Sequence, residues 1–499
     1  MLALKKILYF LPFLSIIAFS FYLFAPVFAT TLNSDHAVHV LMSDHVYLPG
    51  DLYYWGQDRL GSLLPILTHL FIKIIPVKSI TGITVVEFIL LFSAFYFLQT
   101  FLKNYLSKII LCLILFIPFP AMVPQLYIGH PYVSQFFIIS LVLFLTKRYH
   151  GISTDLKIKK QSIWFLICVF LLLTVWISDL SLIFVAAFAV AMILQGILCL
   201  KKSNTGIMTY IKNFIVHAVI FLMVFLPGMK GLNALKSICY QQPGYSELVN
   251  FKTFRKAYSG VYHYFMKSFR LKAGDNVISV YHLAVLIISL VLLFIIIKKI
   301  KERKIKFNFY YTVFFSTFFL GYIATLLSNW AFLNTYGARY FIFCYLFLMF
   351  LIIFYCDTLS GKLMYILQIL FVSGILFYSL RTYEVQKIIC LENGTNHSLK
   401  EIQDLKQFKD AGIIADYWFS YISCIDSEMN VVATPREGTY VRNPALIDSV
   451  FNRKKILLIK NIWLDNFPDT IQQFNRKLYR IGKPESQSNF YYCQYQLPN

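Results

Sequence analysis

Residues 6–42, KILYFLPFLSIIAFSFYLFAPVFATTLNSDHAVHVLM, join a long apolar run to a polar segment. The apolar run ends at Phe28, and a helix of about 20 apolar residues or more is long enough to cross a lipid bilayer. Ser34, Asp35 and His36 follow within a few positions. Because ionisable groups at the rim of a membrane bundle are costly to hold there, this segment indicates a functional site.

The composition extends this interpretation to the whole chain. Of 499 residues, 58% are hydrophobic and 14% are charged, which excludes a soluble globular protein and indicates a polytopic α-helical membrane protein. Apolar runs predict about eleven membrane-spanning helices. They lie at 6–28, 82–102, 109–123, 131–146, 161–177, 182–200, 214–228, 279–297, 309–327, 338–355 and 363–380.

Basic residues predict the orientation, since loops rich in lysine and arginine stay in the cytoplasm. Such clusters lie at 5–6, 147–160, 201–202 and 298–306. They predict a cytoplasmic N-terminus and an extracytoplasmic C-terminal segment, in the plasma or inner membrane of a bacterium. Opposite sides for the two termini require an odd number of spans. The apolar stretch 60–76 must therefore be a juxtamembrane helix that does not cross the membrane. If it crossed instead, twelve spans would place the C-terminal segment in the cytoplasm.

The net charge of +22 does not indicate a nucleic-acid partner. From Arg381 onward the chain holds 15 basic and 13 acidic residues, so the excess charge lies in loops that flank the membrane helices. Basic residues at such positions interact with anionic lipid headgroups. We therefore expect membrane lipids, and no nucleic acid, as partners of this surface.

The hydropathy pattern changes after residue 380. Residues 1–380 form the predicted membrane domain, with outer loops at 30–81 and 230–276, and residues 381–499 form a small extracytoplasmic α/β domain. In that domain the pattern predicts helices at 399–411, 444–451 and 469–478 and strands at 430–434, 455–460 and 490–496.

The first outer loop carries the most informative chemistry. Ser34 is a suitable N-cap, so the residues after it are expected to form a helix. Asp35 and His39 then lie one turn apart on one face, while Asp44 points to the opposite side. One carboxylate is therefore expected to face a cavity. The alternative is that Asp35 only stabilises the positive end of the helix dipole.

Several short motifs resemble the GT-C superfamily of integral-membrane glycosyltransferases. An acidic residue follows the first span, then a helix rich in alanine and valine, then Tyr-Tyr-Trp-Gly-Gln-Asp-Arg-Leu-Gly-Ser at 53–62. Asn-Thr-Tyr-Gly-Ala-Arg-Tyr at 334–340, Ala-Asp-Tyr-Trp-Phe-Ser-Tyr at 415–421 and Tyr-Ile-Gly-His-Pro at 127–131 also resemble elements of that group. The superfamily includes protein O-mannosyltransferases and the lipid A aminoarabinose transferase.

The resemblance implies a reaction. Members use polyprenyl-phosphate-linked sugars, such as undecaprenyl phosphate carriers, and transfer the sugar outside the cytoplasm with inversion. Here Asp35 would be the base, and Arg339, Arg59 and Tyr340 would bind the donor phosphate. The acceptor would be an envelope glycan, a lipid or a protein. Supporting or acceptor-binding roles are expected for His36, His39, Gln57 and Asp58.

His130 departs from the family pattern, which has an aspartate at that position. Its imidazole could bind a metal, contact Asp35 or serve a structural role. A divalent metal ion with Asp35 and His130 as candidate ligands is therefore one expectation. Asp416, Tyr417 and Trp418 could line an acceptor groove by stacking on sugar rings, or could form the contact between the soluble domain and the bundle.

Two other functions fit a membrane protein that handles lipid-linked sugars. A flippase should carry charged residues at mid-membrane depth and matched broken helices, whereas the ionisable residues here gather at the outer rim. A polymerase or ligase of the O-antigen type should place its chemistry in a large late loop with arginines. The sequence favours the transferase.

Overall fold

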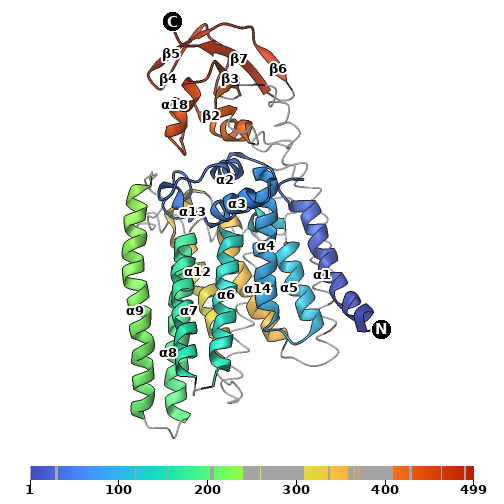
Figure 1. Ribbon diagram of the computed structural model, residues 1–499, viewed down its shortest axis with the longest axis vertical. Helices are drawn as coiled ribbons and strands as arrows, with labels where there is room; N and C mark the ends of the chain where they lie inside the picture. Colours follow the sequence, from blue (N-terminus) through green and yellow to red (C-terminus); the bar gives the residue numbers. More distant parts are fainter. Residues whose placement is uncertain are drawn as a thin grey trace.

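The computed structural model describes residues 2–28, 32–118, 120–153, 156–202, 207–239, 308–334, 338–357, 410–425, 430–461, 463–487 and 490–498, with a few single positions between them. Its helices form a bundle, and a sheet domain lies at one end of that bundle (Figure 1). The described helices are α1 Leu2–Phe24, α2 Ser34–Asp44, α3 Leu63–Ile74, α4 Ser79–Gln99, α5 Tyr105–Phe116, α6 Tyr132–Gly151, α7 Lys157–Ile177, α8 Leu182–Lys202, α9 Ile207–Ile238, α12 Phe309–Leu327, α13 Asn329–Leu333 and α14 Ile342–Cys356.

The chain is an integral membrane protein. Among the described residues, six helical stretches are long and apolar enough to cross a bilayer: Ser79–Gln99, Ile158–Ile177, Asp179–Leu198, Phe214–Ile238, Phe309–Leu327 and Arg339–Cys356. Shorter apolar helices occur at Leu8–Phe24, Leu63–Ile74 and Tyr105–Phe116. The predicted spans 279–297 and 363–380 lie outside the described residues, apart from two single positions, so the number eleven stays a prediction.

The ends of α5 and α9 lie far from the predicted ends of their spans. The α5 helix ends at Phe116, short of residue 123, because Pro118 and Pro120 follow and proline cannot continue a helix. The α9 helix runs through Ile238, ten residues beyond the predicted end of its span. Lys236 in this extension forms an ion pair of 2.7 Å with Asp179, which ties α9 to the turn between α7 and α8. The start of the predicted outer loop at 230 is therefore helical.

Two short helices lie beside the C-terminal domain, at the end of the bundle (Figure 1). They are α2 and α3, which contact each other and the start of α4. With twelve residues, α3 is too short to cross a bilayer, in agreement with the juxtamembrane helix expected for 60–76.

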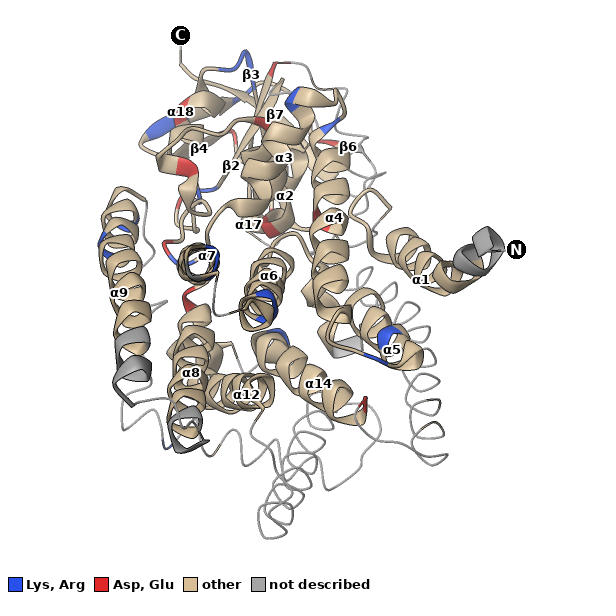
Figure 2. Ribbon diagram, turned by 60° about the horizontal axis from the view of Figure 1, so that its bottom comes forward, with Lys and Arg blue, Asp and Glu red and all other residues tan. Residues whose placement is uncertain are grey.

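Among the bundle helices, α5, α6 and α7 carry lysine and arginine, blue in Figure 2, at their ends that point away from the C-terminal domain. Lys236 of α9 lies instead beside Asp179, at the end near that domain. The N-terminus of α1 also points away from that domain (Figure 1). Which membrane face each end occupies stays a prediction.

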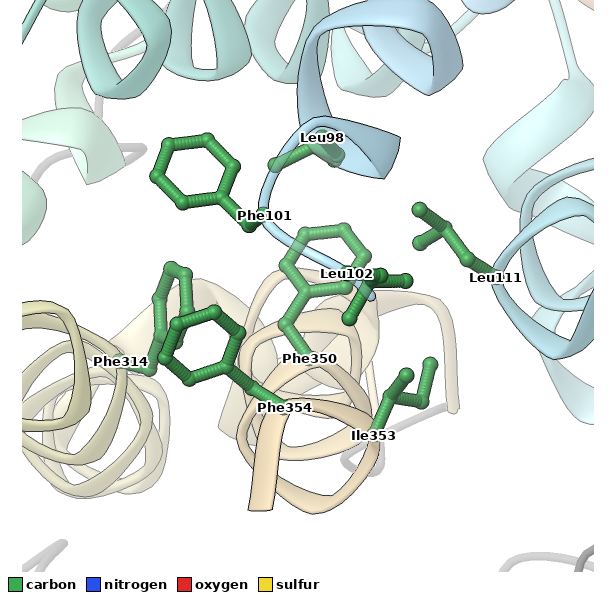
Figure 3. Close-up of a pocket in the computed structure, with 8 residues that line it drawn as sticks. All are labelled: Leu98, Phe101, Leu102, Leu111, Phe314, Phe350, Ile353 and Phe354. Carbon is green, nitrogen blue, oxygen red and sulfur yellow. The ribbon is translucent and has the colours of Figure 1, made fainter. Parts of the chain in front are cut away.

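An apolar pocket lies near this basic end (Figure 3). It is lined by Leu98, Phe101, Leu102, Leu111, Phe314, Phe350, Ile353 and Phe354. Beside it Asp357, which follows α14, accepts hydrogen bonds from the backbone amides of Lys103 (2.8 Å) and Asn104 (2.9 Å). Asp357 therefore joins α14 to the start of α5.

The C-terminal domain contains a seven-stranded mixed sheet. Its strands are β1 Ala411–Ala415, β2 Val431–Pro435, β3 Lys455–Lys460, β4 Thr470–Gln473, β5 Arg476–Arg480, β6 Glu485–Gln487 and β7 Phe490–Gln496. The order is β2-β1-β3-β7-β5-β4, with β6 paired to β7. Strands β1, β2 and β3 are parallel, and β7 is antiparallel to its neighbours. The predicted strands near 430, 455 and 490 are confirmed, as is the helix α18 Ala445–Phe451.

The predicted helix 469–478 is wrong, because this segment forms the β4–β5 hairpin. Ile471, Phe474 and Leu478 have a helix-like spacing, yet Ile471 and Leu478 lie opposite each other across two antiparallel strands. Phe474 and Asn475 both have positive φ, 52° and 59°, which is the backbone of a type I′ turn. The predicted helix 399–411 is also corrected at its end, since Ala411 begins β1. Residues 399–407 lie outside the described residues.

The C-terminal domain contacts α2 through a short helix, α17 Tyr417–Ser420, and the 3₁₀ turn Tyr421–Cys424 that follows it. Both elements follow β1, so the carboxyl end of that strand is directed at the bundle. On the same strand, a Cβ atom at Gly412 would overlap the Val450 carbonyl of α18. Glycine here allows α18 to pack closely on the sheet.

Candidate active site

The first turn of α2 presents Asp35 to the C-terminal domain. Asn33, not Ser34, is the N-cap of this helix. Its side chain accepts a hydrogen bond from the His36 backbone amide (3.2 Å), and the Asn33 amide donates to His36 Nδ1 (3.4 Å). This reciprocal capping box fixes where the helix begins. Asp35 therefore lies in the first turn, where the helix dipole favours a carboxylate.

The carboxylate of Asp35 is engaged on one oxygen. Its Oδ1 accepts hydrogen bonds from the Tyr417 hydroxyl and from Arg442 Nη2, the latter at 2.9 Å. Among the described residues, no group donates to Oδ2. The side chain of Asp35 is 23% exposed, whereas that of Arg442 is 6% exposed. One carboxylate oxygen is thus held by the C-terminal domain while the other stays available.

The charge state of Asp35 follows from opposing effects, of which three are the largest. Burial raises the pKa of the carboxyl group, while the Arg442 guanidinium and the hydrogen bond from Tyr417 lower it. The lowering prevails, so the pKa lies below the ordinary value of 3.8. Asp35 is therefore ionised at neutral pH.

Arg442 is enclosed by three tyrosine rings. Its guanidinium carbon lies 4.7 Å from the ring centre of Tyr440, 5.1 Å from that of Tyr54 and 5.4 Å from that of Tyr417. Its Nε also donates to the Tyr417 hydroxyl at 2.8 Å. The sequence analysis missed Arg442 because 407 positions separate it from Asp35 and no motif surrounds it.

His39 lies on the side of α2 that faces this cluster. Its ring is 4.8 Å from the ring of Tyr54, and neither ring nitrogen has a partner in the described part of the chain. Burial lowers the pKa of His39 to about 3, so the ring is neutral at physiological pH. Asp44, at the far end of the helix, instead accepts a hydrogen bond from Ser79 at the start of α4. The structure thus separates the two aspartates as the helical spacing predicts.

The segment 127–131 packs against the start of α2. The His36 ring lies edge-on to Tyr127 at 5.0 Å, and the His130 ring lies 5.6 Å from Tyr132. Burial, followed by the charge of Arg339, lowers the pKa of His130 to about 3. His130 also interacts electrostatically with Asp35. Sequence motifs about 95 positions apart therefore meet at one site.

The two expected phosphate-binding arginines lie around Tyr132. Arg339 Nη2 donates to the Tyr340 hydroxyl (2.8 Å), and the Tyr132 hydroxyl donates to the Arg339 carbonyl. Arg59 Nε donates to Gln57 Oε1 at 3.4 Å, and its guanidinium lies 5.6 Å from the ring centre of Trp330. Both guanidinium charges act on Tyr132. Residues 335–337 of the same motif lie outside the described residues.

Asp58 is separate from this group. Its charge acts on Asp179, Tyr53 and Cys239, beside the ion pair between Asp179 and Lys236. Together with Arg59, whose carbonyl accepts from the Asp179 amide at 3.4 Å, it connects the 53–62 segment to the end of α7.

The Asp416–Trp418 segment connects the domain to the bundle. Asp416 caps α17, since its Oδ1 accepts from the Phe419 amide at 2.9 Å and its Oδ2 accepts from Asn461. Tyr417 reaches Asp35, and Trp418 packs edge-on against Tyr417 at 5.1 Å. Of the two roles considered for this segment, these contacts support the one between domain and bundle.

The described residues contain no group of three or more His, Cys, Asp and Glu side chains placed to hold a metal ion. Asp35, His36 and His130 are neighbours, but the described residues do not place three such side chains so that they could hold a metal ion together. A metal ion at this position stays an expectation from the sequence.

Comparison with known proteins finds similarity in structure alone. No protein-family model matches the chain, and no curated protein matches it. The crystal structure of ArnT from Cupriavidus metallidurans bound to undecaprenyl phosphate matches over 97% of both chains, with 8% sequence identity and a TM-score of 0.51. The apo form of the same protein matches over 90% of this chain and 91% of that chain, with 8% identity and a TM-score of 0.48. The chain therefore shares the overall fold of ArnT, as the resemblance to the GT-C superfamily implies.

Proposed function

We propose that this protein is an inverting glycosyltransferase that moves a sugar from a polyprenyl-phosphate carrier to an extracytoplasmic acceptor. The observation that carries the proposal is the asymmetry of Asp35. Its Oδ1 is held by Arg442 and Tyr417, while no described residue donates to Oδ2. An ionised carboxylate with one fixed and one available oxygen is suited to accept a proton from an acceptor hydroxyl.

The chemistry can be assigned to the residues in place. As the acceptor oxygen bonds to the anomeric carbon, its hydroxyl becomes acidic, so Asp35 Oδ2 can take the proton despite its low pKa. The bond from that carbon to the phosphate oxygen breaks on the opposite face, which inverts the configuration. The leaving phosphate carries the negative charge. Arg339 and Arg59 supply the positive charge that stabilises it.

The fold supports a lipid-linked donor, because the similar ArnT structure holds undecaprenyl phosphate. The acceptor class is an envelope glycan, a lipid or a protein. The site lies at the end of the bundle that joins the C-terminal domain. We assign this end to the extracytoplasmic side because α5, α6 and α7 carry basic residues at their opposite ends (Figure 2).

The test is transfer from a panel of labelled polyprenyl-phosphate sugars to a crude envelope acceptor fraction. Membranes would carry the wild type, Asp35→Asn or Asp44→Asn. Asp44 is the matched control because it lies on the same helix and bonds to Ser79, away from Arg442. We expect label to move with the wild type and Asp44→Asn, and to stay on the donor with Asp35→Asn.

Equal loss in both variants would contradict the role of Asp35. Silence of the folded wild type across the whole panel would contradict the transferase and favour a lipid-linked sugar transporter, which a flipping assay in vesicles would detect. A parallel assay with EDTA tests the expected metal ion. Loss of transfer that Mg²⁺ or Mn²⁺ restores would show that the reaction requires a divalent cation, and Asp35 and His130 would then be its candidate ligands.

A further inference from the structure

Arg442 reaches the site from a different domain than Asp35. It lies between β2 and α18 of the C-terminal domain, and Asp35 lies on α2 of the bundle. Its side chain is 6% exposed, although arginine is almost always on the surface unless it is paired. Two of its nitrogens, Nη2 and Nε, bond to Asp35 and Tyr417, while Nη1 is buried without a partner in the described part of the chain.

We propose that Arg442 is a positioning residue by which the C-terminal domain orients Asp35 for proton transfer. This inference rests on the proposed function and deepens it. The domain then completes the active site, and a bundle without it would hold Asp35 in several orientations.

The geometry of the three groups supports this role. Arg442 and Tyr417 both donate to Oδ1 of Asp35, and Arg442 also donates to Tyr417. This closed triangle fixes the rotation of the carboxylate and thereby the direction of Oδ2. The fixed fork of a guanidinium can bond to a carboxylate and a hydroxyl at once, whereas the ammonium of lysine is a compact point charge on a flexible stem.

The tyrosine rings hold the guanidinium itself in place. Tyr440, Tyr54 and Tyr417 surround it at 4.7–5.4 Å from the ring centres. The Tyr440 hydroxyl donates to the carbonyl of Gly56, so the cage is anchored on the segment 53–62 of the bundle. Cation–π contacts of this kind are strongest where water is excluded.

The unpartnered nitrogen argues for function over stability. Buried polar groups in native proteins nearly always have hydrogen-bond partners, and exceptions concentrate at functional sites. A residue kept only to dock the domain would gain from pairing all of its donors. Arg442 instead concentrates its two bonds on Asp35 and on the tyrosine that also holds Asp35.

The experiment uses the full-length protein in lipid nanodiscs with the donor identified by the panel. The variants are Arg442→Ala, Arg442→Lys and Arg476→Gln, and kcat and donor KM are measured with and without added guanidinium chloride at millimolar concentration. Arg476 is the matched control, because it forms an ion pair of 2.7 Å with Asp448 in the same domain but takes no part in the contact with α2.

We expect Arg442→Ala to lower kcat by about 10²-fold, since small misplacements of a reacting group can cost that much, while donor KM changes by less than about twofold. Guanidinium should restore part of kcat in Arg442→Ala and none in Asp35→Asn. Arg442→Lys should retain less activity than rescued Arg442→Ala. Arg476→Gln should match the wild type. In the Asp35→Asn background, Arg442→Ala should cause no further loss, because both act through one carboxylate.

A second measurement separates positioning from misfolding. Hydrogen exchange of α2, residues 34–44, should rise in Arg442→Ala and fall again with guanidinium, while exchange in β3 and β7 stays unchanged. An unchanged kcat in Arg442→Ala, a loss confined to KM, or no rescue would overturn the inference while wild-type transfer upholds the proposed function. If the wild type transfers nothing, the proposed function fails. Unaltered hydrogen exchange of α2 in Arg442→Ala would then also contradict the positioning role of Arg442.

Discussion

Two aspartates at opposite ends of the bundle are bound in different ways. Asp357, beside the apolar pocket, accepts a hydrogen bond from the Lys103 amide on Oδ2 and one from the Asn104 amide on Oδ1, so both carboxylate oxygens are engaged by backbone groups. Asp35, beside the C-terminal domain, has donors on Oδ1 alone among the described residues. A carboxylate with both oxygens satisfied joins helices, whereas one with a free oxygen can still react. Hydrogen-bond partners, more than burial, distinguish the two ends.

The surroundings of the two aspartates also differ in polarity. Beside Asp35, the ring nitrogens of His39 and Nη1 of Arg442 are buried without partners in the part of the chain that the structure describes. Beside Asp357, the pocket is lined by leucine, isoleucine and phenylalanine. Buried polar atoms without partners in the described part of the chain also occur within the bundle helices, at Glu87 of α4 and Gln195 of α8, so they are not confined to the end that holds Asp35.

The largest effect expected from this comparison is on transfer. Asp35→Asn should lower kcat by about 10³-fold or more, since it removes the base. It should also lower thermal stability, because the buried Arg442 guanidinium loses its charged partner. Asp357→Ala should lower thermal stability and leave activity per folded molecule nearly unchanged. Loss of its two backbone bonds leaves buried amides unsatisfied, at a cost of about 1–3 kcal/mol each. Thermal unfolding in detergent measures the stability of each variant, and transfer per folded molecule measures its activity. Loss of activity per folded molecule in Asp357→Ala would break the comparison.

The next effect is on donor binding. Arg339→Lys should raise donor KM by about tenfold, because lysine cannot form the bidentate contact that a guanidinium makes with phosphate. Arg59→Lys should act in the same direction. Arg453→Lys is the control, since Arg453 pairs with Asp410 in the C-terminal domain. Steady-state kinetics with varied donor measure the change, and an unaltered KM in both variants would remove these arginines from the phosphate site.

A smaller effect is expected where the two domains touch at Gly56. This residue has φ of +72°, and a Cβ atom there would overlap the Tyr440 hydroxyl. Gly56→Ala should therefore lower kcat several-fold and cost about 1–3 kcal/mol of stability. Gly50→Ala is the control, because a Cβ at Gly50 meets no atom within 4 Å. Equal behaviour of the two variants would show that the cage around Arg442 tolerates displacement.

The smallest expected effect is that of pH between 7 and 5. Asp35 must be ionised to act, and because Arg442 and Tyr417 lower its pKa below 3.8, it stays ionised across this range. His39 and His130, with pKa values of about 3, stay neutral. The ratio kcat/KM should therefore change by less than about twofold. A loss centred near pH 6 would indicate a histidine that titrates in the reaction.

The lowered pKa of Asp35 also makes the stability of the protein depend on pH. Since the folded-state pKa of Asp35 is lowered, its pairing stabilises the protein above the unfolded value of about 3.8 and loses that contribution as pH falls through the folded-state value. Docking of the C-terminal domain should therefore weaken only in strong acid. Proteolysis of the domain boundary across pH measures this.

Local signals in the sequence predicted much of the fold. Long apolar runs identify membrane helices because backbone groups in lipid must bond within their own segment. Strand β3 was predicted at its observed bounds because four of its six residues are aliphatic and form a short run between turns. The β4–β5 hairpin was mistaken for a helix because Ile471, Phe474 and Leu478 fit a helical period, and the turn at Phe474 and Asn475 lacks the glycine that normally marks it.

In the candidate site, too, the sequence predicted what depends on neighbouring residues and missed what depends on distant ones. The separation of Asp35 from Asp44 depends on helical period within eleven residues, so the sequence by itself determined it. The membrane class and the position of Asp35 after the first helix are likewise local properties of the chain. The pairing of Asp35 with Arg442, the tyrosine cage and the free Oδ2 were decided by the tertiary structure alone. They join segments about 400 positions apart, and such contacts are set by packing, which no local pattern of residues encodes.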